Sequence, residues 1–139
     1  MAYWLLKTEP TEYSWQQLAK DKNTAWTGVR NYQARNNLRD MSVGDFALVY
    51  HSGEDKEIVG IAKITKAAFP DPTADNDAWV SVQVEAIKPV TRTITLEEIR
   101  NTHNLCNMPL VTHTRLSVMP ITESQWQDVL KYTKTESPS

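Results

Sequence analysis

The chain has 139 residues, of which 40% are hydrophobic and 23% are charged, as is typical of one soluble globular domain. Its formal net charge of -2 at pH 7 argues against a sequence-independent nucleic-acid binder, which needs many contacts from lysine and arginine to phosphates. Cys106 is the single cysteine, which excludes an internal disulfide and a cysteine-based metal centre. No apolar run approaches the roughly 20 residues of a membrane-spanning helix, so we expect a cytoplasmic protein with no membrane contact.

The first forty residues predict two strands and two helices. The apolar run at 3–6 indicates a strand over residues 3–7, which ends before Pro10 because proline disfavours helical geometry in the residue before it. The sequence S-W-Q-Q at 14–17 is typical of a capping box that opens a short helix, and a short strand is expected at 24–26. Asn31 is the expected N-cap of a helix over 32–39.

The central part of the chain predicts three strands. Residues 46–50 are almost continuously apolar, which favours a buried strand, and 58–67 follow after a polar hairpin turn. Residues 69–76 are rich in proline and are expected to stay outside the sheet. Residues 78–87 alternate, with Val80, Val82, Val84 and Ala86 expected inward and the residues between them, Ser81 included, outward.

The C-terminal part is expected to contain two further capped helices. Pro89 and the residues up to Arg92 predict a bend, and T-L-E-E at 95–98 predicts a helix to about residue 101. A helical turn near 106–110 is compatible with the sequence. A last strand is expected at 115–119, closed by Pro120. T-E-S-Q at 122–125 then predicts a helix with an apolar stripe.

The pattern of elements indicates the fold class. Five or six strands with short helices inserted between them predict an α+β domain around a mixed, partly closed sheet. No repeat or long linker divides the chain, so we expect one domain over residues 1–133. The polar residues 134–139 are expected to form a disordered tail.

Three stretches together resemble a known family. Y-W-L-L-K-T-E-P, W-T-G-V-R-N-Y-Q-A-R-N-N-L-R and G-D-F-A-L-V-Y-H-S are similar to the EVE domain, a member of the PUA-like superfamily related to the YTH readers of methylated adenine. I-V-G-I-A-K-I, A-F-P-D-P-T-A and R-L-S-V-M-P-I match as well, so the resemblance runs from about residue 2 to 132. It implies a PUA-like β-barrel and an aromatic-lined pocket near Trp26.

The candidate pocket residues centre on Trp26. Composition alone favours a buried core tryptophan, whereas the resemblance favours a stacking wall for a base, with Trp15 or Tyr32 as a second wall. Asn31 could cap the helix and also read the base edge, together with backbone amides near Val29.

Polar residues at two strand ends are further candidates. Lys7 lies at the end of the first strand, and Tyr50, His51 and Ser52 lie at the end of the buried strand that begins at residue 46. Each could contact a ligand or be an ordinary satisfied residue. Ser117 is a weaker pocket candidate, because an ordinary strand residue explains it equally well.

Three arginines could hold a nucleic-acid backbone. Arg35 and Arg39 are four residues apart and share one face of the predicted helix, while Arg30 precedes it. The alternative is that all three are ordinary solvated side chains.

The chain shows no catalytic motif. It contains no G-x-S-x-G elbow and no H-E-x-x-H helix, and its four glycines cannot form a phosphate cradle. We therefore expect a monomeric, non-catalytic module without metal or cofactor, which binds DNA or RNA at a modified base. The resemblance implies methylated or hydroxymethylated cytosine, with methylated adenine as a further option. The alternatives are a pocket for a free nucleotide or metabolite, an uncharacterised enzyme, and an accessory protein that acts through partner contacts.

Overall fold

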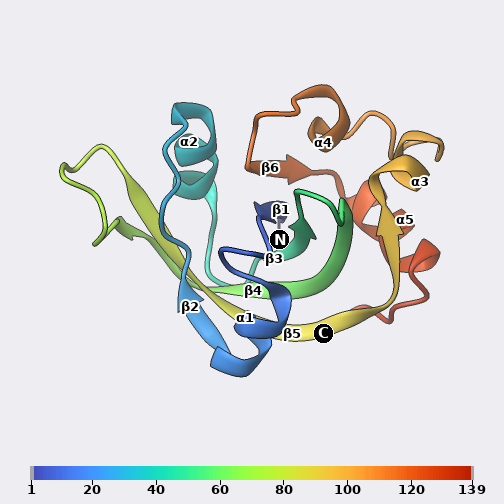
Figure 1. Ribbon diagram of the computed structural model, residues 1–139, viewed down its shortest axis with the longest axis horizontal. Coiled ribbons are helices and arrows are strands. Elements are labelled where there is room, and N and C mark those ends of the chain that lie inside the picture. Colours follow the sequence, from blue (N-terminus) through green and yellow to red (C-terminus); the bar gives the residue numbers. More distant parts are fainter. Residues whose placement is uncertain (1, 139) are drawn as a thin grey trace.

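The structure is a computed structural model that describes residues 2–138 (Figure 1). Six strands form one sheet, and helices lie between or after them. The strands are β1 (Tyr3–Thr8), β2 (Asn23–Ala25), β3 (Phe46–His51), β4 (Glu57–Pro70), β5 (Val80–Thr95) and β6 (Val118–Ile121). The helices are α1 (Trp15–Asp21), α2 (Tyr32–Asp40), α3 (Leu96–Arg100), α4 (Pro109–Thr112) and α5 (Glu123–Tyr132). None of the described helices is long and apolar enough to span a membrane.

The sheet is mixed and strongly curved. Its strand order is β2-β5-β4-β3-β1-β6, with a parallel pair of β1 and β3 and antiparallel pairs elsewhere. The long strands β4 and β5 bend around β1 and β3 (Figure 1). The predicted α+β class with a mixed six-stranded sheet is confirmed. The sheet is nevertheless open in residues 2–138, with β2 and β6 as its edges, so closure into a barrel is not shown.

Both faces of the sheet are covered. On one face, α1 and α2 contribute Trp15, Leu18, Ala34 and Leu38 to a core that also contains Trp26. On the opposite face, the helices α3, α4 and α5 cover a second core. All six residues of β3 are buried, which explains why its sequence is continuously apolar rather than alternating.

The longest hairpin differs from the sequence prediction. Phe69 and Pro70 pair with Ser81 and Val80, so the loop expected at 69–76 begins only at residue 71. The bend expected at 89–92 does not end the strand, because β5 continues to residue 95, but the β4–β5 ladder shifts register there, between the pairs Ile58–Ile94 and Gly60–Pro89. Several register shifts in the ladder of β4 and β5 bend the strands without ending them, as β-bulges do.

Three local expectations also need correction. Ser81 was expected to point outward, but its side chain is fully buried. The last strand runs over Val118–Ile121 and includes Pro120, which is tolerated because β6 is an edge strand that pairs with β1. In the tail, Thr135 is buried: its N–H donates to the carbonyl of Leu130, and its hydroxyl accepts from the N–H of Thr91.

Candidate functional site

A pocket of about 460 Å³ opens beside the C-terminal end of β1. This size lies within the range usual for small-ligand sites. Its wall comes from the end of β1, the loop before α1, the strand β2, the loop before α2, and one residue before β6. The lining residues are Lys7, Thr8, Glu9, Glu12, Tyr13, Thr24, Ala25, Trp26, Thr27, Gly28, Val29, Arg30, Asn31 and Ser117.

Two aromatic rings form the apolar part of the pocket. Trp26 is only 8% exposed, and its backbone N–H donates to the carbonyl of Val82 over 2.8 Å, which continues the pairing of β2 with β5. The ring of Tyr13 meets it edge to face, with centroids 6.2 Å apart. The Tyr13 hydroxyl donates to Asp21 over 2.8 Å, and burial together with this carboxylate raises the pKa of Tyr13 to about 12. Tyr13 is therefore a neutral, fixed neighbour of Trp26.

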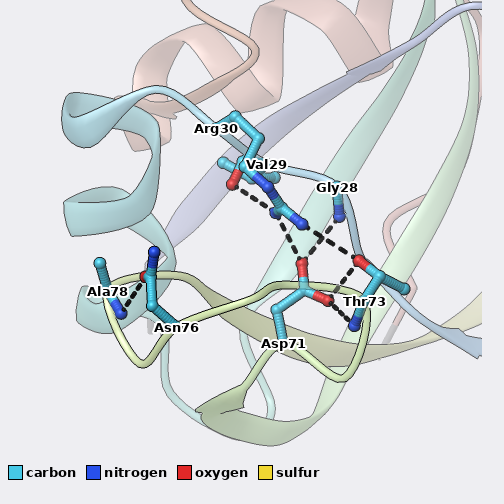
Figure 2. A network of polar contacts seen from close by, with 7 residues as sticks. All are labelled: Gly28, Val29, Arg30, Asp71, Thr73, Asn76 and Ala78. Carbon is cyan, nitrogen blue, oxygen red and sulfur yellow. Dashed lines mark hydrogen bonds and ion pairs between the residues drawn. The ribbon is translucent and has the colours of Figure 1, made fainter.

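The buried carboxylate of Asp71, which comes from the β4–β5 hairpin, holds the loop of residues 26–31 (Figure 2). One oxygen of Asp71 accepts from the N–H of Gly28 and from the guanidinium of Arg30, each over 2.9 Å. Its other oxygen accepts from the N–H and the hydroxyl of Thr73, each over 2.7 Å. Gly28 has a positive φ of 83°, a conformation in which most other residues would be strained. The tip of the β4–β5 hairpin thus fixes the backbone of the pocket wall.

Asp71 remains ionised over the usual pH range. Burial by itself would raise the pKa of this carboxyl, but the hydrogen bonds from Thr73, Arg30 and Gly28 outweigh it and lower the pKa to about 2. The side chain of Asp71 has no exposed surface, whereas that of Arg30 is 39% exposed. The guanidinium of Arg30 is therefore held by an ion pair and still reaches the pocket rim.

The helix α2 begins at the pocket. The side chain of Asn31 accepts from the N–H of Ala34 over 2.9 Å, which confirms the predicted N-cap. On the buried side of the helix, the amide of Asn37 donates to the carbonyl of Val118 over 2.7 Å and ties α2 to β6. Asn31 is exposed and lines the pocket, so its amide lies where a ligand can contact it.

The rim carries groups of both charges. The ammonium of Lys7 donates to the carbonyl of Thr114 over 2.8 Å, and partial burial lowers the pKa of Lys7. The N–H of Lys7 donates to the carbonyl of Ser117, which brings Ser117 to the pocket. Glu9 and Glu12 add two carboxylates that the sequence interpretation missed. The signal available for Glu9 was its position directly after the first strand, beside Lys7.

Glu9 is the more fixed of the two acids. Its carboxylate lies so close to Gly53 that a Cβ there would be 2.3 Å from one oxygen. The hydroxyl of Thr11 donates to the other oxygen over 3.3 Å. Glu12, by contrast, is exposed. The pocket therefore presents one acceptor that is held by contacts and one exposed acceptor at its edge.

Several predicted ligand residues lie away from the pocket lining. The Trp15 side chain packs on Gly60, and the backbone N–H of Trp15 donates to Nε2 of buried His51 over 2.9 Å. The other nitrogen of His51 is 3.4 Å from Asp55, so both ring nitrogens have protein partners. Tyr50 is only 2% exposed, and the backbone N–H of Ser52 donates to the carbonyl of Thr8. The structure thus places these four residues in the packing of α1 on the sheet and in the adjoining strand ends.

Tyr32 and two arginines lie on the outer surface of α2. Tyr32 is 62% exposed and stands outside the pocket lining. Arg35 is partly exposed and Arg39 is exposed. Of the three predicted backbone-contacting arginines, the structure therefore brings Arg30 to the pocket and leaves the other two on the helix. Within residues 2–138, no three His, Cys, Asp or Glu side chains are grouped to hold a metal ion.

Comparison with known proteins gives consistent matches over the whole fold. Residues 2–132 match the EVE domain. Thymocyte nuclear protein 1 from Mus musculus is 38% identical over 168 residues, covering 96% of this chain and 74% of the relative. The crystal structure of human THYN1 protein in complex with DNA containing 5-methylcytosine has a TM-score of 0.90 and 34% identity, with 99% of this chain and 100% of that chain covered.

A more distant structure shares the fold. The YTH domain of the Zygosaccharomyces rouxii MRB1 protein, solved in complex with N6-methyladenosine RNA, has a TM-score of 0.62 at 12% identity. The match covers 99% of this chain and 89% of that chain. At this identity the likeness concerns the fold alone.

Proposed function

Because this chain belongs to the EVE domain family, we propose that it is a non-catalytic module that binds a nucleic acid and takes one modified base into the pocket beside Trp26. The observation that carries the proposal is the pocket itself, in which an aromatic wall and fixed polar groups surround a space of the right size for a base. A relative with the same fold was solved with DNA that contains 5-methylcytosine, which supports a nucleic-acid partner.

The aromatic wall supplies affinity for the flat face of a base. Trp26 lines the pocket although it is only 8% exposed, and the ring of Tyr13 meets it edge to face. Stacking of a base on an aromatic side chain contributes about 1–3 kcal/mol and does not depend on base identity. To reach this wall, a nucleotide has to leave the stack of its strand, as in other proteins that flip bases.

The polar rim supplies selectivity for the edge of the base. Asn31 and the backbone near Val29 offer hydrogen-bonding groups, and Lys7 offers a positively charged donor. The carboxylate of Glu9 is an acceptor and pairs with an exocyclic amino group, which cytosine and adenine have and thymine and uracil lack. An acceptor at the rim is compatible with cytosine and adenine, and we propose methylated or hydroxymethylated cytosine as the ligand, with methylated adenine as the second option.

The strand that carries the base is held weakly. The net charge of -2 leaves little general attraction for phosphates, so affinity has to come mainly from the pocket. Arg30 at the rim and Arg35 and Arg39 on α2 are the cations placed to contact the nearest phosphates. We propose that the protein acts in this way as a monomer on DNA or RNA.

The test is binding of labelled single- and double-stranded oligonucleotides, followed by fluorescence anisotropy. Each oligonucleotide carries one cytosine, 5-methylcytosine, 5-hydroxymethylcytosine or N6-methyladenine at the same position. We expect one modified base to bind more tightly than its unmodified parent, and Trp26→Leu to weaken that binding about tenfold or more. Trp126→Leu removes a buried tryptophan from the opposite face and serves as the matched control. Equal binding of all oligonucleotides, or binding of free nucleotides alone, would contradict the proposal.

A further inference from the structure

Tyr32 is an exposed aromatic residue that the pocket does not use. It is the first residue of α2, directly after Asn31, and its side chain is 62% exposed. Its ring stacks on Trp79 with centroids 4.9 Å apart and an angle of 30° between the planes. Trp79 comes from the end of the 71–79 loop and is partly exposed. Two large rings therefore meet at the surface, where burial alone gives no reason for them.

Two arginines extend this stack at its ends. The guanidinium carbon of Arg30 is 5.7 Å from the ring centroid of Trp79, and that of Arg35 is 5.0 Å from the ring centroid of Tyr32. Both distances are in the range of cation–π contacts. We call these four residues, Arg30, Trp79, Tyr32 and Arg35, the aromatic–arginine strip.

The strip keeps a positive charge at its outer end. The guanidinium of Arg35 donates to the carbonyl of Ala78 over 3.1 Å and to the side-chain oxygen of Asn36 over 2.9 Å. Both partners are neutral, so the charge of Arg35 is available to an anion. At the inner end, the charge of Arg30 is already balanced by Asp71. A phosphate is therefore expected nearer to Arg35 than to Arg30.

The strip begins at the pocket. Arg30 belongs to the strip and also lines the pocket, and Tyr32 follows the pocket residue Asn31 directly. A nucleotide whose base occupies the pocket has neighbours on the same strand, and one of them has to pass over this surface. Asp75 and Asp77 are exposed on the same loop as Trp79, so they disfavour a phosphate above the loop. Stacking on Tyr32 and a phosphate contact at Arg35 are the interactions that remain.

We propose that the aromatic–arginine strip is a second nucleotide site. There, the Arg35 guanidinium moves off the outer face of Tyr32, the base next to the flipped one stacks on that face, and Arg35 contacts the connecting phosphate. This inference rests on the proposed function, since it needs a base in the pocket. It identifies the ligand as a strand of at least two nucleotides with an unpaired neighbour, and it separates this protein from one that binds free nucleosides. Stacked aromatic platforms bind successive bases of single strands in this manner.

The experiment compares two ligands that differ only in their flanking nucleotides. One is the modified nucleoside monophosphate that the pocket binds best, and the other is a trinucleotide with the same modified base in the middle. Affinities are measured by calorimetry for the wild type, Tyr32→Ala, Tyr32→Trp and Arg35→Gln. Arg92→Gln is the matched control, because Arg92 also lies over a tyrosine ring, Tyr132, and lines no part of the pocket.

We expect the trinucleotide to bind the wild type about tenfold more tightly than the monophosphate. Tyr32→Ala should remove that gain and leave monophosphate binding unchanged, while Tyr32→Trp should preserve the gain. Arg35→Gln should reduce the gain in part, and Arg92→Gln should have no effect. A trinucleotide that binds no more tightly, or a Tyr32→Ala protein that weakens both ligands equally or neither, overturns the inference. If no modified ligand binds the wild type, the proposed function itself fails.

Discussion

The carboxylate of Asp71 accepts a 2.9 Å hydrogen bond from the backbone N–H of Gly28, although the two residues are 43 positions apart in the sequence. This contact joins the tip of the β4–β5 hairpin to the loop that forms the pocket wall. The same oxygen also holds Arg30, which lies on the pocket rim and in the aromatic–arginine strip. A single buried side chain thus fixes both proposed nucleotide sites relative to the sheet.

Replacement of Asp71 by asparagine is expected to weaken both folding and binding. The amide would present an N–H₂ group to the donors of Gly28, Arg30 or Thr73, and at least one buried donor would lose its partner. Such a loss costs about 1–3 kcal/mol. Urea denaturation measures the stability change and anisotropy measures the change in oligonucleotide affinity. Asp75→Asn, an exposed substitution on the same loop, should change neither.

Acid should remove the contribution of Asp71 to the free energy of unfolding. The pKa of this carboxyl is about 2 in the folded protein and 3.8 is its ordinary value, so the folded state binds the proton less readily than the unfolded chain. The stabilisation is therefore fully present above about pH 4 and declines as the pH falls towards 2. Urea midpoints between pH 2 and 5 should fall more steeply in the wild type than in Asp71→Asn. Parallel curves would mean that other carboxyls account for the acid sensitivity.

Glu9→Gln is expected to relax the choice between amino and keto bases. 5-Methylcytosine and thymine share the 5-methyl group, but 5-methylcytosine has a 4-amino group where thymine has a 4-keto group. A carboxylate accepts a hydrogen bond from the amino group and repels the keto oxygen. The amide of glutamine can donate as well as accept. The wild type should prefer 5-methylcytosine to thymine in the same oligonucleotide, and Glu9→Gln should reduce that preference about tenfold. Glu12→Gln is the control, and an unchanged preference in Glu9→Gln would exclude Glu9 as the reading group.

Ligand binding should weaken at alkaline pH because of Lys7. Partial burial lowers the pKa of its ammonium, so it loses its proton at a lower pH than an ordinary lysine at 10.5. The charged donor is present at neutral pH and disappears as the pH rises through the lowered pKa. Affinity should decline over that range in the wild type, whereas Lys7→Gln should bind more weakly but with a flat profile. N6-Methyladenine is the suitable probe base, because it does not lose a proton there.

His51 is expected to affect stability and not binding. The Nε2 atom of His51 accepts a hydrogen bond from the backbone N–H of Trp15 in the first turn of α1, and the His51 side chain is buried. In His51→Leu that N–H loses its acceptor, which should lower the free energy of unfolding by about 1–3 kcal/mol. His51→Gln, which can offer an acceptor, should lose less. Oligonucleotide affinity at a temperature where all three proteins are folded should be equal, and a selective loss of binding would restore His51 to the ligand site.

Local patterns predicted the helices well. Ser14, Asn31, Thr95 and Thr122 each cap the helix that the sequence indicated, because a cap depends on atoms within three residues of it. The apolar run that became β3 was equally clear. The register shifts between β4 and β5 were not predictable, since they depend on how two strands of unequal curvature pair.

The pocket was predictable only in part, because several of its contacts join segments that are far apart in the sequence. Trp26, Val29 and Asn31 come from one continuous stretch, and the structure places all three at the pocket. The strand-end argument failed to anticipate that the start of α1 covers the end of β3, where His51 accepts from Trp15. Asp71 lies in a proline-rich stretch with no local pattern, and only the folded hairpin brings it beneath the pocket loop.

The place of β1 in the sheet has a consequence for how the molecule assembles. This strand, at the beginning of the chain, lies between β3 and β6, and the register pairs Leu5 with Leu48 on one side and with Met119 on the other. During synthesis on a ribosome, residues 3–8 would therefore keep one hydrogen-bonding edge uncovered until the residues of β6 had been added. Such long-range closure slows folding and leaves an edge open to pairing with other nascent chains. The strand order therefore makes the pairing of β1 with β6 a late step of folding, irrespective of what the finished pocket binds.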